Sequence, residues 1–204
     1  MTDEWDNYFY EGTNVLKNKF GIKDQKKLEE QEKVITLRKL TELELLPITG
    51  KFNLEHLKKI HKYLFNDIYY FAGEFRRSTM AKTTRQFYDP EYIKDELEKT
   101  LNILNENVND VYDKRKYSYV LAKAYYDLMS IHPFREGNGR SVREYLRELV
   151  LYKNKDLPFK VKLDFSKMDS DLFLKAVEYR YVYPSLLEDE FYKALTPLEK
   201  GLQK

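Results

Sequence analysis

Residues 117–143 read YSYVLAKAYYDLMSIHPFREGNGRSVR, and the pattern of this stretch indicates the class of fold. Its first part has apolar residues at positions i, i+3, i+4, i+7, i+8 and i+11, which are Tyr117, Val120, Leu121, Ala124, Tyr125 and Leu128. An apolar face this broad is typical of a helix in the centre of a core. Because proline cannot lie inside a helix, Pro133 predicts that this helix ends just before His132, which then begins a loop.

The rest of the chain also predicts helices. A second core helix follows the loop, because Val142, Tyr145, Leu146 and Leu149 repeat with helical spacing. Further helices are expected over residues 24–46, over residues 53–66 with Asn53 as N-cap, from Asp89-Pro90-Glu91 to about Leu104, and from two starts at Ser166 and Ser185 on either side of Pro184. Both serines have the spacing of a capping box, to Asp169 and Glu188.

Composition agrees with an all-α fold in one domain. The 204 residues include only 7 Gly and 6 Pro, so the chain has few breaks, and the 34% charged and 42% hydrophobic residues suit amphipathic helices. We find no internal repeat and no low-complexity tract, so residues 1–204 are expected to form a single domain.

The charge balance and the residue composition also disfavour nucleic-acid binding, cysteine chemistry and a membrane span. Lys and Arg total 36 against 34 Asp and Glu, so the net charge of +2 provides no global field, and no direct binding of nucleic acid is expected. The chain has no cysteine, which excludes disulfides and thiolate chemistry and agrees with a reducing cytosol. The acidic N-terminus does not resemble a signal peptide, and no run of about 18 uncharged apolar residues predicts a membrane span.

One segment breaks the helical pattern, between Glu74 and Asp89. It contains Phe75, Ser78, Thr79, Met80, Phe87 and Tyr88, which are compatible with strands, around a polar stretch from Lys82 to Arg85. A short, irregular β-hairpin is one interpretation. An ordinary connector of about 15 residues fits the residue pattern equally well.

The residues that can do chemistry concentrate in residues 132–143, which we call the signature. His132 at the start of a loop can accept a proton, and Gly137-Asn138-Gly139 can turn backbone N–H groups toward an anion at the N-terminus of the next helix. Arg140 and Arg143 lie three residues apart on that helix, so both can reach one phosphate group. Glu136 is the carboxylate that could hold Mg²⁺ between phosphate oxygens.

Each of these residues also has an ordinary explanation. A lone His before Pro is more often a capping or core residue, Gly-Asn-Gly is a common turn, and an Arg stripe is usually a solvated helix face. Phe134 is interpreted as a core anchor for the loop in either case. His56 and His61 are interpreted as ordinary helix residues, since no acidic cluster lies at metal-binding spacing from them. The order in which all the elements occur together favours the functional interpretation.

The signature resembles that of the Fic family, His-Pro-Phe-x-(Asp or Glu)-Gly-Asn-Gly-Arg-x-x-Arg, at every specified position. Leu57 to Arg76 is also similar to the family's segment before its active-site flap, and Tyr8 to Gln25 resembles the start of small bacterial Fic proteins. The resemblance implies a Fic-type helical bundle, with the signature loop and following helix at residues 132–147 and a β-hairpin flap at about residues 76–88.

The same resemblance implies a protein adenylyltransferase, an enzyme that transfers AMP from ATP to a Ser, Thr or Tyr hydroxyl of a target protein, with Mg²⁺. It implies the following roles: His132 as base, Glu136 as metal ligand, Gly137, Asn138, Gly139, Arg140 and Arg143 on the phosphates, and a flap with Met80, Lys82, Thr83 and Thr84 that docks the target by strand pairing. Two alternatives stay open: a Fic-fold transferase of a phosphoryl, UMP or phosphocholine group, and a non-catalytic nucleotide-binding module.

The resemblance also raises the question of control. Many Fic proteins carry an inhibitory (Ser/Thr)-x-x-x-Glu-(Gly/Asn) helix, but Asn7-x-x-x-Glu11-Gly12 lacks the hydroxyl residue and Ser185-x-x-x-Asp189-Glu190 lacks the Glu and the Gly. The segment after Ala194-Leu195-Thr196 has only eight residues. We therefore expect inhibition by a separate small antitoxin whose Glu pairs with Arg143. The chain is expected to be a cytoplasmic bacterial toxin, or a domain delivered into a host cell.

Overall fold

The computed structural model describes residues 8–82, 85–179 and 182–198 of the chain. Within these residues the fold consists of helices α1 (Gln25–Leu45), α2 (Leu54–Phe65), α3 (Ile93–Asn107), α4 (Lys114–Ile131), α5 (Asn138–Lys153), α6 (Ser170–Glu178) and α7 (Pro184–Ala194). Two small antiparallel sheets accompany them, β1 (Ala81–Lys82) with β2 (Arg85–Gln86) and β3 (Val161–Leu163) with β4 (Leu195–Pro197). The all-α prediction is confirmed.

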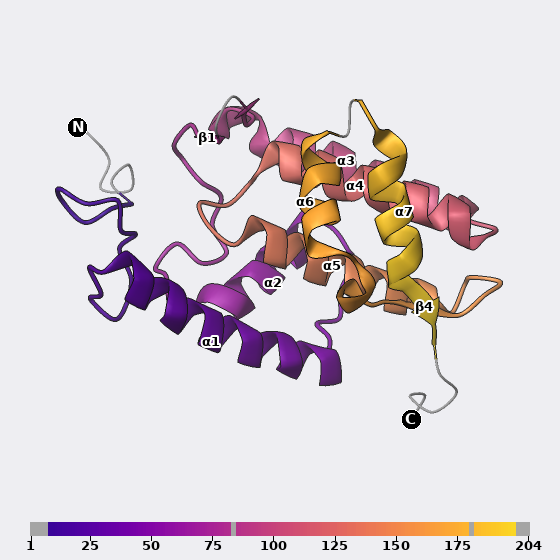
Figure 1. Cartoon of the computed structure of the whole chain (residues 1–204), viewed down its shortest axis with the longest axis horizontal. Coiled ribbons are helices and arrows are strands. Elements are labelled where there is room, and N and C mark those ends of the chain that lie inside the picture. Colours follow the sequence, from indigo (N-terminus) through magenta and orange to yellow (C-terminus); the bar gives the residue numbers. More distant parts are fainter. Residues whose placement is uncertain (1–7, 83–84, 180–181, 199–204) are drawn as a thin grey trace.

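The core lies around α4 and α5, the two helices that the signature connects. Helix α4 contacts α3, α5 and α7, while α5 also contacts α2. Helix α1 covers α2 along one edge of the molecule, and α6 packs on α7 at the opposite side (Figure 1). Leu121 and Leu128 of α4 and Tyr145 and Leu146 of α5 are fully buried, because their helical spacing directs them to the same face.

Most predicted helix boundaries are confirmed to within a few residues. Asn53 is the N-cap of α2, and its side-chain oxygen accepts a hydrogen bond from the His56 N–H at 3.1 Å. Residues Pro90–Tyr92 form a 3₁₀ turn, so α3 itself begins only at Ile93.

The two predicted serine caps are wrong. Ser166 lies inside a 3₁₀ turn, and α6 begins instead after Asp169, whose carboxylate accepts from the N–H groups of Asp171 and Leu172 at 3.0 and 2.9 Å. A carboxylate is a stronger acceptor than a hydroxyl at the positive end of a helix. The two helices predicted on either side of Pro184 are present as α6 and α7, but Pro184 is itself the first residue of α7, a position where its missing N–H costs nothing.

The hairpin predicted between Glu74 and Asp89 is present. Ala81 pairs with Gln86 and Lys82 with Arg85, and the Phe87 N–H donates to the Met80 carbonyl at 3.1 Å. Thr83 and Thr84, which were expected at its tip, lie outside the described residues. The β3–β4 pair has no counterpart in the sequence prediction, because its three-residue strands are too short to show a period.

Helices long and apolar enough to cross a membrane are absent from the part of the chain that the structure describes.

Candidate active site

The signature forms a tight connection between α4 and α5. His132 is the C-cap of α4 and has a left-handed backbone, with φ of 52° and ψ of 61°. Gly137, the N-cap of α5, has φ of 78°. A Cβ atom at Gly137 would lie 2.2 Å from Cζ of Phe65, so both the backbone conformation and the close packing require glycine there. The glycine thus brings the α5 N-terminus close to α2.

Phe134 fixes the loop to the core. Its side chain is fully buried and stacks on the His61 ring, with ring centroids 3.8 Å apart. The Asn138 side chain closes the loop from the other side, accepting from the Phe134 N–H at 2.8 Å and donating to the Phe134 carbonyl at 2.7 Å. Because this side chain is buried and used within the loop, Asn138 has only its backbone N–H to offer a phosphate.

His61 supports the same loop from α2. Its Nδ1 accepts a hydrogen bond from the Gly73 N–H at 2.8 Å, so the proton is on Nε2, which donates to the Glu136 carbonyl at 3.0 Å. Burial lowers the pKa of His61 from 6.5 to about 4, so the ring is neutral at physiological pH. The sequence interpretation of His61 as an ordinary helix residue missed its contact with the signature.

His132 faces the flap. The Phe87 ring stacks on the imidazole, with centroids 3.9 Å apart and planes 11° apart, and His132 is only partly exposed. The sequence interpretation placed His132 at the start of a loop and gave it no contact with another segment. The structure instead places it between the end of α4 and a flap residue.

Arg140 is held by several groups. Its Nη2 lies 2.5 Å from Oε1 of Glu32 on α1 and 3.3 Å from Oε1 of Glu136, and its guanidinium lies over the Phe65 ring at 4.8 Å. Glu32 also accepts from the Tyr69 hydroxyl. The spacing of Glu32 four residues after Leu28 indicates that it faces the core, but nothing in the sequence relates it to Arg140.

Arg143 and Arg147 differ in their surroundings. Among the described residues no carboxylate forms an ion pair with Arg143, whose side chain lies beside Gly139 and Tyr125. Arg147 is paired with Glu144 at 2.6 Å and also donates to the Leu43 carbonyl at 2.9 Å, so it serves the structure. Of these two arginines, Arg143 is therefore the one that can bind an added anion.

A groove of about 1000 Å³ opens beside these arginines, between the C-terminal half of α1, helix α5 and residues 160–166. Six cationic side chains line it, against three carboxylates: Arg140, Arg143, Arg147, Lys155, Lys160 and Lys162 against Glu44, Glu144 and Asp164. This excess of positive charge suits an anionic occupant.

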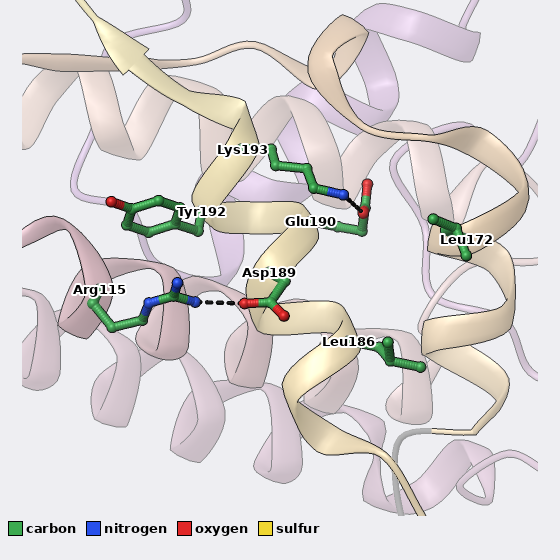
Figure 2. Close-up of a pocket in the computed structure, with 7 residues that line it drawn as sticks. All are labelled: Arg115, Leu172, Leu186, Asp189, Glu190, Tyr192 and Lys193. Carbon is green, nitrogen blue, oxygen red and sulfur yellow. Dashed lines mark hydrogen bonds and ion pairs between the residues drawn. The ribbon is translucent and has the colours of Figure 1, made fainter.

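A second hollow, of about 280 Å³, lies between the start of α4 and helices α6 and α7 (Figure 2). Its charged groups are paired, Arg115 with Asp189 at 2.6 Å and Lys193 with Glu190 at 2.5 Å. None of its lining residues belongs to the signature. This hollow has no role in the candidate active site.

Glu136 has the properties of a ligand for Mg²⁺ shared with phosphates. Its side chain is 42% exposed, and its Oε1 accepts from the Gly137 N–H at 2.8 Å. No cluster of three or more His, Cys, Asp or Glu side chains occurs in the described ranges. This arrangement fits Mg²⁺, which proteins often hold through one or two carboxylates together with phosphate oxygens and water.

The flap lies next to the signature, but its candidate docking residues are only partly described. Met80 approaches the signature, with its Sδ 3.7 Å from Nη1 of Arg135. Lys82 belongs to β1 by its backbone. The docking roles of Met80, Lys82, Thr83 and Thr84 remain predictions.

Comparisons with known proteins agree with this geometry. Residues 51–150 match the Fic/DOC family. A probable protein adenylyltransferase of Sinorhizobium fredii, y4lH, is 31% identical over 170 residues, which are 82% of this chain and 84% of that protein. The probable protein adenylyltransferase Fic of Escherichia coli is 30% identical over 72% of this chain and 73% of that protein. The chain therefore belongs to the Fic/DOC family.

Another relative is much longer. The chain is 37% identical to protein adenylyltransferase VbhT of Bartonella schoenbuchensis over 68% of its own length but spans only 29% of that protein. Among solved structures, BepC of Bartonella tribocorum with bound AMPPNP has a TM-score of 0.84 and 26% identity, covering 95% of this chain and 98% of that one. A Fic domain of Bartonella quintana with bound ADP has a TM-score of 0.85 and 27% identity, covering 95% and 96%. The predicted Fic-type bundle is confirmed.

Proposed function

We propose that this chain is a protein adenylyltransferase that transfers AMP from ATP to a hydroxyl side chain of a target protein. The observation that carries the proposal is the intact signature between α4 and α5, with His132 at one helix end and Gly137 to Gly139 at the other. The names of relatives at 30 to 37% identity support the adenylyl group as the one transferred.

His132 acts as the general base in this proposal. A ring nitrogen of His132 accepts the proton of the target hydroxyl, and the hydroxyl oxygen attacks the α-phosphorus of ATP. Pyrophosphate leaves as the bond between the α-phosphorus and the oxygen that bridges to the β-phosphate breaks. General-base catalysis of this kind contributes roughly 10² to 10⁴-fold to the rate. The short connection to α5 keeps the base close to the phosphate-binding residues, so position supplies much of the remaining acceleration.

The phosphates bind where α5 begins. The backbone N–H groups of the first turn have no partner within the helix, and the helix dipole is positive at this end. Arg140 and Arg143 follow on the same helix and supply guanidinium groups for the phosphates beyond the α-phosphate. Glu136 is the residue that would hold Mg²⁺, which neutralises phosphate charge when it is bound.

The flap, residues 76–88, serves as the docking site for the target protein. β1 and β2 pair only with each other in the described part of the chain, so an extended target segment can add to this hairpin through backbone hydrogen bonds.

The mass of the group attached to a modified protein tests the reaction, since adenylyl, phosphoryl, uridylyl and phosphocholine groups differ in mass. A phosphoryl, UMP or phosphocholine adduct would assign the chain to one of the other transferase reactions.

A small antitoxin in trans is the proposed regulator. A Glu of that partner would form a bidentate pair with Arg143, which lines the cationic groove and has no carboxylate partner among the described residues. Within the chain, Asp189 and Glu190 are engaged with Arg115 and Lys193, away from the signature. The chain would act in the bacterial cytoplasm, or in a host cell if it is delivered there.

Growth of bacteria that express the chain alone tests this regulation. We expect the wild-type chain to slow growth relative to the His132→Ala variant, and the purified chain to transfer AMP without any activation. Harmless, nearly inactive protein that becomes active when Glu11, Glu188 or Glu190 is replaced would mean that the inhibitor lies within the chain.

A further inference from the structure

A buried arginine from outside the signature holds the end of α4. Arg76 is 2% exposed, and its Nε donates to the His132 carbonyl at 2.8 Å while its Nη2 donates to the Ile131 carbonyl at 3.2 Å. Its backbone N–H donates to the Pro133 carbonyl at 2.9 Å. Three consecutive carbonyl groups around the candidate base are therefore satisfied by this one residue.

These bonds stabilise an unfavourable backbone. The last carbonyl groups of a helix lack partners within it, and a cation there also interacts well with the negative end of the helix dipole. A residue other than glycine in the left-handed conformation is strained, and the conformation persists only where the surroundings of the residue enforce it. Arg76 enforces it at His132, and the backbone at His132 sets the direction in which the imidazole leaves the chain.

The same guanidinium holds both ends of the flap hairpin. Nη1 of Arg76 donates to the Ser78 carbonyl at 2.7 Å, and Nη2 donates to the Tyr88 carbonyl. Ser78 precedes β1 and Tyr88 follows β2. Beside Tyr88, the Phe87 ring stacks on the His132 imidazole. The flap therefore contacts the base in two ways, through the fork of Arg76 and through the ring of Phe87.

We propose that Arg76, together with Phe87, positions His132 and couples the flap to it, so that a target segment on the flap fixes the imidazole in its reactive orientation. The proposal rests on the proposed function, in which the flap docks the target and His132 is the base. Arg76 touches neither nucleotide nor target in this account and acts through His132. Its planar fork reaches four carbonyl groups at fixed angles, which the single ammonium of lysine does not reproduce.

The test compares Arg76→Lys and Phe87→Leu with wild type, and with Arg115→Lys as a matched control at the other end of α4. Transfer of labelled AMP is measured at varied ATP. We expect kcat to fall about 10- to 100-fold in both variants, with KM for ATP unchanged, because small misplacement of a reacting group has effects of that size. Arg115→Lys should match wild type.

A second measurement does not depend on activity. The chain has three histidines, so the ring signals of His132 can be followed in the NMR spectrum with those of His56 and His61 as internal references. We expect the His132 signals to shift and broaden in both variants while those of His56 remain in place. A wild-type chain without transfer activity would count against the proposed function, whereas the spectra would still test the positioning of His132.

Two results would overturn the proposal. One is an unchanged His132 spectrum in both folded variants. The other is a loss of thermal stability in which kcat falls only in proportion to the folded fraction, with KM for ATP unchanged, which would make Arg76 a helix cap and no more. Phe87→Leu keeps an apolar side chain at the site, so it decides the question if Arg76→Lys fails to fold.

Discussion

Oε1 of Glu32 on α1 lies 2.5 Å from Nη2 of Arg140, so an acidic residue more than 100 positions away in the sequence contacts the first arginine of the signature. The pair is largely buried, and the hydroxyl of Tyr69 holds the other carboxylate oxygen. Its negative charge lies beside the proposed phosphate site. Glu32 therefore reduces the positive field that ATP meets while it keeps Arg140 in place.

Glu32→Gln is expected to tighten ATP binding about fivefold. The amide keeps an acceptor for Arg140 but removes a unit charge, and at an effective dielectric constant of about 20 such a charge several ångströms from a phosphate is worth roughly 1 kcal/mol or more. Calorimetric titration with ATP measures the change. Glu30→Gln, an equal change of charge on the exposed face of α1, is the control. Weaker binding in Glu32→Gln would show that orientation of Arg140 outweighs the charge.

Glu136→Ala is expected to abolish the dependence of ATP binding on Mg²⁺. The variant loses the carboxylate that would share the cation with the phosphates, so its Kd for ATP with Mg²⁺ should equal its Kd in a chelator. Titrations in both conditions measure this, with exposed Glu98→Ala as the control. If Mg²⁺ still improves ATP binding to Glu136→Ala, the assignment of the metal ligand is wrong.

His61 is expected to make the fold sensitive to acid. Burial lowers its pKa in the folded chain from 6.5 to about 4, so below pH 6.5 the unfolded chain takes up a proton that the folded chain does not. The free energy of unfolding should therefore decrease as the pH falls from about 6.5 toward 4, by about 2 kcal/mol between pH 7 and pH 5.

Urea unfolding of wild type and His61→Gln at these two pH values isolates this contribution. Glutamine does not titrate, so the variant should lose about 2 kcal/mol less than wild type over the same interval. An equal loss in both proteins would mean that His61 is protonated in the folded chain.

Thr79→Pro is expected to reduce modification of target proteins about fivefold while leaving self-modification unchanged. Proline removes a backbone N–H from the flap, and one lost hydrogen bond to a docked strand corresponds to roughly 1 kcal/mol. Label incorporation into cell lysate and into the chain itself gives both rates, with Thr79→Ala as the control. A proportional loss of both activities would argue against the flap as docking site.

The sequence was sufficient where the signal was local. The apolar face of residues 117–128 predicted α4, Pro133 predicted its end, and the glycines predicted the start of α5, because each of these effects acts within a few residues. The resemblance of residues 132–143 to the Fic signature predicted the family.

The sequence was insufficient where contacts join distant segments. Glu32, His61 and Arg76 reach the signature from α1, α2 and the flap, and no spacing in the chain relates them to it. Competition between neighbouring polar groups caused the error at Ser166, since Asp169 caps α6 in its place. Such competition depends on the backbone geometry of each turn, which composition does not fix.

The most direct test of the central claim is the fate of ATP labelled at one phosphate. Purified chain and the His132→Ala variant are incubated with cell lysate and ATP labelled either at the α- or at the γ-phosphate, and protein-bound label is counted. We expect the chain to add label only from α-labelled ATP, compared with lysate to which no chain is added, with a loss of at least about 10²-fold in His132→Ala, which should still bind ATP and unfold near the wild-type temperature. Incorporation of the γ-label above that of lysate alone, or equal incorporation of the α-label by both proteins, would contradict AMP transfer with His132 as base.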